Sequence, residues 1–316
     1  MNIKKLAGLS LVFMLVLSIS SFAIFAQGQD VLRSDGSSTV YPIASLAASY
    51  WNSNPPITDS EYWPASDYGI DTNKSLADYW ASLYGLETFN VAVGLSHSGV
   101  GLNKVAEGKV DIGNSSAGAE YEFPEKSDEE LSEYTGHIVG KDRQAFSVSK
   151  EVYKAGCDIL TREEIEGIFR GRITNWSGVH SCNYDREIQA VGRAVGSGTE
   201  TMFRVNVFGS SEVTGLDGVD VRYGQNQMVQ QALKKSDNGI GYPGIDFVSS
   251  DNPAVEVVWD DGNTYSVEDQ AWPLGRPLYM YTWKGTNKKE AAFLRMILSD
   301  FGQSVFVDQG TDYFML

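Results

Sequence analysis

Apolar and polar residues follow two periodicities along most of the chain, one typical of strands and the other of helices. Residues 30–36 (DVLRSDG) form a strand-length stretch, after which apolar side chains recur at helical spacing at Ile43, Ala47 and Trp51. A similar strand pattern at residues 89–96 precedes a second helical pattern through Leu102 and Val105, and residues 109–116 form a short, buried strand pattern. This order of strand, turn, helix and strand predicts an α/β fold.

Later segments continue this pattern. Thr161 with Glu164 three residues later has the form of a capping box, which predicts the start of a helix. Apolar residues at helical spacing from Phe293 to Phe301 predict another helix near the end of the chain. The acidic run at residues 127–134 is typical of a solvated face.

Two kinds of interruption suggest how the domains are organised. Residues 52–86 break the pattern with prolines and aromatics, and we interpret them as an insertion, partly helical over 74–84, whose aromatics form a small satellite core. Glycines at residues 137–143 and 238–246 suggest two crossings between domains. We therefore predict a discontinuous first domain, residues 27–138 and 246–316, with a second domain, residues 139–245, inserted into it.

The first 26 residues have the pattern of a secretory signal peptide. Lys4 and Lys5 precede an apolar run over residues 11–17, and small residues lead to Ala26. An uncleaved anchor is the alternative, but the apolar run is short for a bilayer span. We therefore expect an exported protein, periplasmic or otherwise extracytoplasmic, whose mature chain starts near Gln27.

Composition limits the possible partners and cofactors. The formal net charge of −16 over 316 residues argues against nucleic acid or anionic lipid, because both require clustered lysine and arginine. A small anion stays possible, because local dipoles rather than net charge decide its binding. The chain's histidines, His97, His137 and His180, have no second ligand at zinc spacing, so we expect no metal and no cofactor.

Cys157 and Cys182 are the only cysteines. In an exported chain an even pair favours one disulfide, which here would close a loop of about 25 residues. Two separate thiols are the alternative.

Three turns rich in glycine and hydroxyl residues lie between strand and helix patterns. Such a turn leaves free backbone N–H groups at the positive end of the helix dipole, so it attracts anions without any lysine. Rotatable hydroxyls add donors, and the arginine before the third turn adds a planar donor fork suited to an oxyanion. An ordinary helix N-cap is the competing interpretation of each turn taken alone. The candidate anion ligands are Ser38, Thr39 and the Val40 N–H in the first turn, Ser98 in the second, Ser116 after the following strand, and Arg193, Ser197, Gly198 and Thr199 in the third.

The motifs GSSTVYP, SGVG, KVDIGNSS, ITNW, GSGT, NGIGY and RPLYMYT follow one another in an order and spacing that resembles the PstS-like phosphate-binding proteins of ABC transporters. The resemblance covers essentially the whole chain after residue 26. It implies a type II periplasmic-binding-protein fold with two α/β domains that close over a dehydrated phosphate, and no catalysis. It also implies delivery of the phosphate to an ABC-type permease, and we expect a monomer.

Two positions depart from this family pattern. Members often carry an aspartate, which accepts the phosphate proton, where this chain has Ser116, and Asp111 fits a structural strand-end position better. Members also often have an acid between the arginine and GSGT, where this chain has Val195. Discrimination of phosphate from sulfate would then depend on another proton acceptor, for which Glu200 or a backbone carbonyl are the candidates.

Other functions are compatible with parts of the pattern. Sulfate, tungstate or molybdate could replace phosphate, because sulfate lacks the proton that an acidic acceptor would recognise. An exported phosphatase is a further alternative, but VGSGTE is not a G-x-S-x-G motif, and scattered histidines do not form a metal cluster. An adhesive surface protein would use the aromatics of the insertion as its contact face.

Overall fold

A computed structural model describes residues 30–57, 70, 73–180 and 182–308. The predicted signal peptide, residues 1–26, lies outside the described residues. The chain divides into two compact units, Met1–Val31 and Leu32–Leu316, and the sheets and cores below belong to the second.

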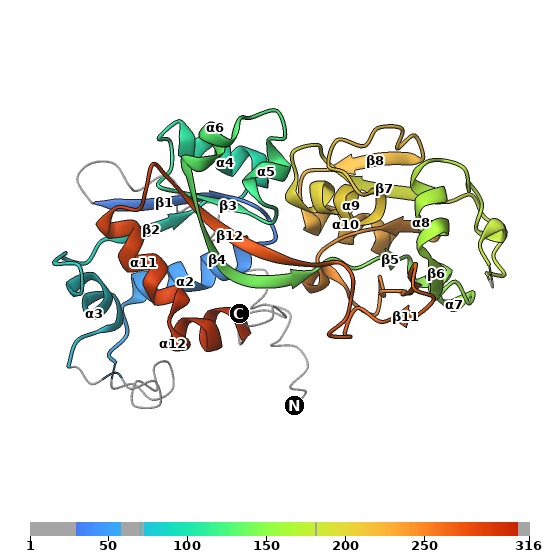
Figure 1. Ribbon diagram of the computed structural model, residues 1–316. Coiled ribbons are helices and arrows are strands. Elements are labelled where there is room, and N and C mark those ends of the chain that lie inside the picture. Colours follow the sequence, from blue (N-terminus) through green and yellow to red (C-terminus); the bar gives the residue numbers. More distant parts are fainter. Residues whose placement is uncertain (1–29, 58–69, 71–72, 181, 309–316) are drawn as a thin grey trace, which may run out of the picture. The chain divides into compact units, whose positions relative to one another are not determined.

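One mixed sheet has five strands in the order β2-β1-β3-β12-β4. β1 and β3 are parallel, whereas β12 runs antiparallel to both β3 and β4. Figure 1 shows the long strands β4 and β12 side by side. The strands are β1 (Val31–Gly36), β2 (Asn90–Val93), β3 (Ile112–Ser115), β4 (Tyr134–Arg143) and β12 (Gly275–Trp283).

The other strands form two smaller sheets. A four-stranded sheet has the order β5-β9-β7-β8, and a three-stranded sheet has the order β11-β10-β6. The strands are β5 (Ser147–Val148), β6 (Ile159–Thr161), β7 (Gln189–Arg193), β8 (Val219–Tyr223), β9 (Gly239–Gly241), β10 (Glu256–Val258) and β11 (Thr264–Tyr265).

Helices cover these sheets. The α-helices are α2 (Tyr41–Ser53), α3 (Leu76–Ser82), α4 (Ser98–Ala106), α5 (Ala119–Glu122), α6 (Asp128–Ser132), α7 (Lys150–Lys154), α8 (Arg162–Phe169), α9 (Gly198–Phe208), α10 (Asn226–Lys235), α11 (Lys288–Leu298) and α12 (Asp300–Gly302). Shorter turns are η4 (Trp176–Gly178), η5 (Ile245–Phe247) and the π-helical η6 (Gln303–Asp308).

Separate apolar clusters stabilise the sheets. Trp51 of α2 and Phe293 of α11 are fully buried in the cluster on one face of the five-stranded sheet. Leu102 of α4 lies in the cluster on the other face, with Tyr281 of β12. A further cluster under the smaller sheets contains Phe146 and Phe203. The α/β fold predicted from the sequence is confirmed.

Most of the predicted elements are present. The strands β1, β2 and β3 and the helices α2 and α4 lie where the hydrophobic pattern places them, and Thr161 and Glu164 form a complete capping box on α8. The last predicted helix is interrupted, because Ser299 adopts an extended conformation after Leu298 and its hydroxyl caps α12 instead. Phe301 therefore belongs to the next short helix rather than to α11.

The interpretation of residues 52–86 needs one correction. Its helix α3 is present, but Trp80 packs in the main cluster with Trp51 rather than in a satellite core. The reason is that the buried face of α3, including Leu76, turns toward α2 and α11. Tyr62, Trp63 and Tyr68 of the predicted contact face lie outside the described residues.

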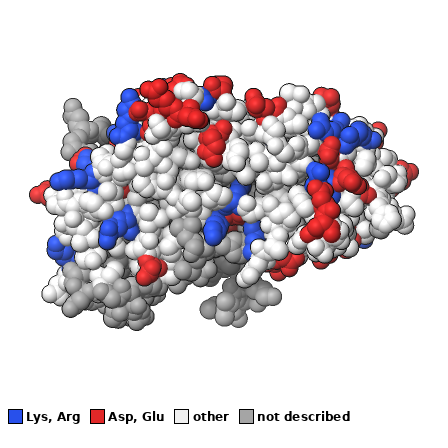
Figure 2. All heavy atoms as spheres, viewed as in Figure 1, with Lys and Arg blue, Asp and Glu red and all other residues white. Residues whose placement is uncertain are grey.

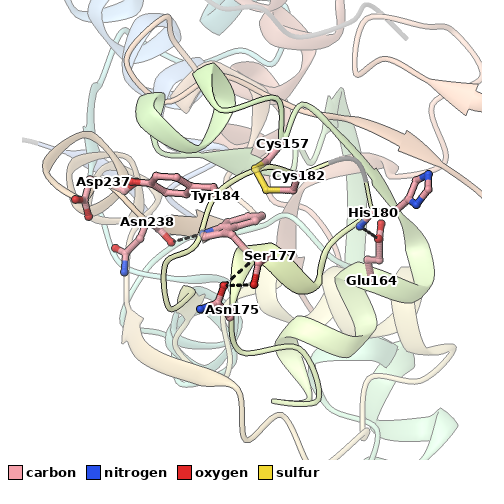
Figure 3. Close-up of a disulfide and its surroundings, with 10 residues drawn as sticks. Cys157, Glu164, Asn175, Ser177, His180, Cys182, Tyr184, Asp237 and Asn238 are labelled. Carbon is pink, nitrogen blue, oxygen red and sulfur yellow. Dashed lines mark hydrogen bonds between the residues drawn. A yellow bond between two sulfur atoms is a disulfide. The ribbon is translucent and has the colours of Figure 1, made fainter.

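Cys157 and Cys182 form a disulfide, which confirms the predicted pairing (Figure 3). Cys157 follows α7 and is fully buried in the cluster under the smaller sheets, which we call the second core. Its Cα lies 4.6 Å from that of Cys182. The bond closes a sequence separation of 25 residues, which limits the freedom of the unfolded chain.

Acidic side chains dominate parts of the surface. Figure 2 shows a concentration of red side chains over the region that contains α6, whose residues include Asp128, Glu129 and Glu130. No residue of α6 is buried, which fits the predicted solvated acidic face.

Among the described residues, no helix combines the length and the apolar character that a membrane crossing requires.

Candidate functional site

The first turn of the candidate site joins β1 to α2. Its backbone folds tightly over the end of β3, where the Ser37 N–H donates to the Asn114 carbonyl over 2.9 Å. Gly36 adopts a φ of +141°, and a Cβ there would collide with the Asn114 carbonyl oxygen. A glycine is therefore required for the turn to approach the sheet, and the turn places Ser38 and Thr39 at the start of α2.

The hydroxyl groups of these turns do not cap their helices. Val40, His97 and Ser197 occupy the N-cap positions of α2, α4 and α9, and none of them makes a side-chain capping bond. By contrast, α6, α8 and α11 each have a complete capping box. The ordinary N-cap interpretation therefore fails for the three turns, because no N-cap side chain compensates the positive ends of their helix dipoles.

Arg193, at the end of β7, is the central charge of this region. Its side chain is 1% exposed, and its guanidinium donates to the carbonyls of Tyr223 (3.2 Å) and Gly224 (2.8 Å) and to the Asn226 side-chain oxygen. It also lies 3.3 Å from the Ser38 hydroxyl, a contact between the first and third turns. Among the described residues no carboxylate forms an ion pair with it, so neutral oxygens hold its charge in place without cancelling it.

The pKa of Arg193 reflects this environment. Burial and, to a smaller extent, the nearby positive charge of Arg276 lower the pKa to about 9, against the opposing effects of Tyr242, Glu200 and Glu122. Arg193 is still a cation at neutral pH. A buried cation that lies near a second one would be stabilised by an anion between them.

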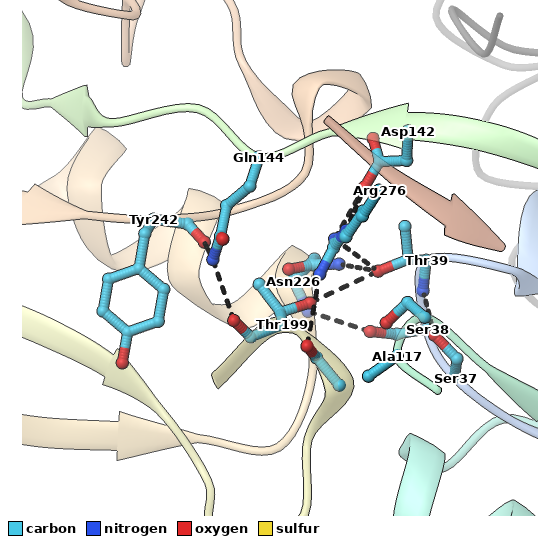
Figure 4. A network of polar contacts seen from close by, with 12 residues as sticks. Ser37, Ser38, Thr39, Ala117, Asp142, Gln144, Thr199, Asn226, Tyr242 and Arg276 are labelled. Atoms are coloured by element: carbon cyan, nitrogen blue, oxygen red, sulfur yellow. Dashed lines mark hydrogen bonds and ion pairs between the residues drawn. The ribbon is translucent and has the colours of Figure 1, made fainter. Parts of the chain in front are cut away.

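Thr39 forms the second point of convergence (Figure 4). Its hydroxyl lies 3.4 Å from the Thr199 hydroxyl and accepts hydrogen bonds from the Asn226 amide (2.9 Å) and the Arg276 guanidinium (3.3 Å). Thr39 follows β1, Thr199 is the second residue of α9, Asn226 begins α10 and Arg276 lies on β12. Four segments far apart in the sequence thus place donors within a few ångströms of one another.

The remaining predicted ligands lie beside this point. The Ser98 hydroxyl accepts a hydrogen bond from the Ser116 N–H over 3.1 Å and lies 3.5 Å from the Ser116 hydroxyl. Gly198 faces both, because a Cβ added to it would lie 2.6 Å from the Ser116 Oγ and closer still to the Ser98 Oγ. His97 Nδ1 donates to the Gly196 carbonyl over 2.7 Å, which joins the second turn to the third.

All nine predicted ligand residues are buried, and the structure brings them into one region. The sequence analysis did not identify Arg276, Asp142 or Asn226 as part of it. Arg276 makes two hydrogen bonds to one Asp142 carboxylate oxygen, at 2.9 and 2.6 Å, and both side chains are fully buried. The RPLYMYT motif contained this arginine, but nothing in the motif showed that the side chain points inward.

Arg193 is braced without an acid at position 195. Val195 is 72% exposed and contributes nothing to the arginine, whereas backbone carbonyls hold the guanidinium directly. Glu200 acts one step away: its carboxylate accepts from Arg222 and from the Tyr242 hydroxyl, which in turn accepts the Arg193 backbone N–H over 3.0 Å. This network holds the end of β7 in position.

The chemistry available at this site is that of binding. Its donors are hydroxyls, amides, helix N-termini and two guanidinium groups, a set that matches a small oxyanion. The described residues include no group of three or more His, Cys, Asp or Glu able to hold a metal ion.

Comparisons with known proteins identify the family of the chain. A sequence profile for the PBP superfamily domain matches residues 23–300. The chain belongs to the PBP superfamily. Among named relatives, the phosphate-binding protein PstS of Staphylococcus saprophyticus is 27% identical over 225 residues, with 68% of each protein covered. Its counterpart in Staphylococcus aureus is 24% identical over 225 residues, covering 68% of this chain and 67% of that protein.

Solved structures of PBP-like proteins share the fold. A putative phosphate ABC transporter substrate-binding protein from Clostridium perfringens, with bound phosphate, has a TM-score of 0.65 and 20% identity, covering 91% of this chain and 100% of that one. A phosphate binding protein from Stenotrophomonas maltophilia has a TM-score of 0.58 and 14% identity, with 91% of both chains covered. At these identities the likeness concerns the fold alone.

Proposed function

We propose that this member of the PBP superfamily is an exported solute-binding protein that captures inorganic phosphate and delivers it to an ABC-type permease, without catalysing a reaction. The observation that carries the proposal is the fully buried Arg193, held by neutral oxygens and surrounded by uncapped helix N-termini. The names of the staphylococcal relatives point to the same ligand. We further propose that the protein is a monomer outside the cytoplasm.

The proposed ligands are the nine residues predicted from the sequence, with Arg276 and Asn226 added. Ser38, Thr39, Val40, Ser98 and Ser116 would hold the anion from the side of the five-stranded sheet. Arg193, Ser197, Gly198 and Thr199 would hold it from the side of the four-stranded sheet. An anion bound by both groups favours the arrangement that brings them together, which is the basis of hinge closure.

We keep the proposal of a discontinuous first domain with an inserted second one, and move its second boundary. The sequence analysis placed that boundary at residue 246. Val255, Val257 and Trp272 pack in the second core with Phe146, which supports a crossing at the start of β12 instead. The first crossing, after β4, is unchanged within a few residues.

Calorimetric titration of the protein with phosphate and with sulfate tests the proposed function. We expect saturable phosphate binding with one site per chain, because the proposed ligands surround a single region. Heat from neither anion would contradict the proposal. A second candidate, a general binder of tetrahedral oxyanions, is favoured by Ser116, which supplies a hydroxyl where an acidic acceptor would exclude sulfate; equal affinities for the two anions would support it.

Replacing Gly198 with alanine should weaken phosphate binding about tenfold or more. The added Cβ would collide with the Ser98 Oγ of the second turn and would lie 2.6 Å from the Ser116 Oγ, so the third turn could no longer approach these two residues as closely. Gly178→Ala is a matched control, since its Cβ would meet its nearest neighbour, Ile173, at an ordinary 3.5 Å. Equal phosphate affinity of both variants, measured by calorimetry, would show that this contact does not limit binding.

A further inference from the structure

Glu122, the last residue of α5, carries a buried carboxyl group that the ligands described above do not use. Both of its oxygens are shielded from solvent, although the residue as a whole is partly exposed. The Thr201 hydroxyl lies close enough to lower its pKa, yet among the described residues none makes a well-formed hydrogen bond to either oxygen. A buried carboxyl left in this state is costly, which suggests that it has a partner in the liganded protein.

The position of this carboxyl places it at the candidate site. A Cβ added to Gly99 would lie 3.3 Å from the Glu122 Oε2. Gly99 follows Ser98 directly, and its N–H donates to the Gly196 carbonyl over 2.9 Å. The carboxyl therefore lies where the second and third turns meet, and α5 packs against α4 and α9, the helices that begin there.

The surrounding charges also connect Glu122 to the site. Arg276 and Arg193 both act on the carboxyl, and both favour its ionised form. Burial has the larger, opposite effect and raises the pKa of Glu122 to about 8. The group is therefore mostly a neutral acid at neutral pH and ionises in the mildly alkaline range.

Other titratable groups near Glu122 are already engaged or face solvent. Glu200 on α9 is bound by two arginines, and the Tyr281 hydroxyl on β12 accepts the Ala119 N–H. The titratable and charged groups on α5 and on the elements packed against it are Glu120 and Tyr121 on α5, His97 and Lys104 at α4, Glu200 and Arg204 on α9, and Arg276, Tyr279 and Tyr281 on β12.

We propose that the Glu122 carboxyl faces the bound anion and shares one proton with it, so that Glu122 determines the preference for phosphate over sulfate. This inference rests on the proposed phosphate-binding function. When Glu122 is ionised, it accepts a hydrogen bond from the proton that phosphate carries. Sulfate has no proton, so its oxygens and the carboxylate are both acceptors and repel each other. When Glu122 is protonated it donates to either anion. Glu122 on α5 thereby supplies the acidic acceptor that this chain lacks at Ser116.

The sign of the pH effect follows from this proton count. Sulfate requires protonated Glu122, so its affinity falls as the pH rises through the pKa of about 8. Phosphate carries a proton of its own, so its affinity does not fall in this way. Between about pH 7.5 and about pH 9.0, sulfate affinity should fall roughly eightfold relative to phosphate affinity.

The test is calorimetric titration with both anions at these two pH values, using the unchanged protein, Glu122→Gln and Glu120→Gln. Glutamine is nearly isosteric and does not titrate, so we expect the affinity ratio of Glu122→Gln to be independent of pH. Glu120→Gln changes an exposed carboxyl on the same helix and should behave like the unchanged protein. The same pH dependence in Glu122→Gln and in the unchanged protein would overturn the assignment.

A second measurement needs no variant. Sulfate binding by the unchanged protein at about pH 9.0, measured in two buffers of different ionisation enthalpy, should take up close to one proton, and phosphate binding should take up almost none. Equal proton uptake for both anions would overturn the inference while leaving the proposed function in place. Absence of binding of either anion would overturn both.

Discussion

Arg193→Ala is expected to weaken phosphate binding by about a hundredfold or more. The guanidinium is a buried full charge beside the first turn, and it is held without a neutralising carboxylate. Removing one member of a buried, hydrogen-bonded charge pair costs about 2–5 kcal/mol, which corresponds to roughly 30-fold to several thousandfold in affinity. Phosphate titration by calorimetry measures the loss directly.

Two further variants show whether the loss comes from the arginine as a ligand. Arg193→Lys retains a positive charge but loses the planar fork, so its affinity should lie between those of the unchanged protein and Arg193→Ala. Arg172→Ala removes an exposed arginine paired with Glu166 and should leave phosphate affinity unaltered. Thermal unfolding with and without phosphate confirms that each variant folds, and unaltered affinity in Arg193→Ala would place the anion site elsewhere.

The turns of the site could be predicted because their signals are local. Glycine and hydroxyl residues directly before an apolar helical pattern mark a strand-to-helix junction, and β1, α2, α4 and α9 begin or end where these signals lie. What local sequence could not show is whether a hydroxyl caps its helix. Thr161 and Ser197 have the same N-cap position on α8 and α9, yet only Thr161 caps. The difference depends on which hydrogen-bond partners the tertiary structure places near each hydroxyl.

The residues that the sequence analysis missed come from long-range pairing. Arg276 and Asp142 are direct partners in the β12–β4 ladder, although the two strands are separated by more than a hundred residues. The register between strands so far apart in the sequence cannot be predicted from the alternation of apolar and polar residues in either strand alone. Glu122 was missed for a different reason, since a helix as short as α5 has no periodic pattern to show which side chains turn inward.

Val195 shows how a departure from the family pattern can be compensated in three dimensions. The missing acid between the arginine and GSGT is replaced by the carbonyls of Tyr223, the last residue of β8, and of Gly224, which no motif identifies. Neutral oxygens orient the guanidinium but leave its charge available to an anion. This arrangement allows a strongly acidic protein to hold an anion, because the interaction is short-ranged and shielded from water.

Asp142→Ala is expected to lower the free energy of unfolding by about 3–5 kcal/mol, because it leaves the buried Arg276 guanidinium without its carboxylate. Both side chains are fully buried, and they are joined over 2.6 Å. Such a loss is a large part of the 5–15 kcal/mol that typically stabilises a domain. Urea denaturation of the ligand-free protein measures it, and a loss below about 1 kcal/mol would show that water or another group reaches Arg276.

The double variant Asp142→Leu with Arg276→Met separates the structural role of this pair from its role in binding. Apolar side chains of similar volume often replace a buried ion pair at little cost, so the double variant should recover most of the stability that Asp142→Ala loses. Its phosphate affinity should nevertheless stay reduced, because the Arg276 contact to the Thr39 hydroxyl, 3.3 Å in the structure, is gone. Recovery of stability together with full affinity would assign Arg276 to the fold alone and leave Arg193 as the cation that binds phosphate.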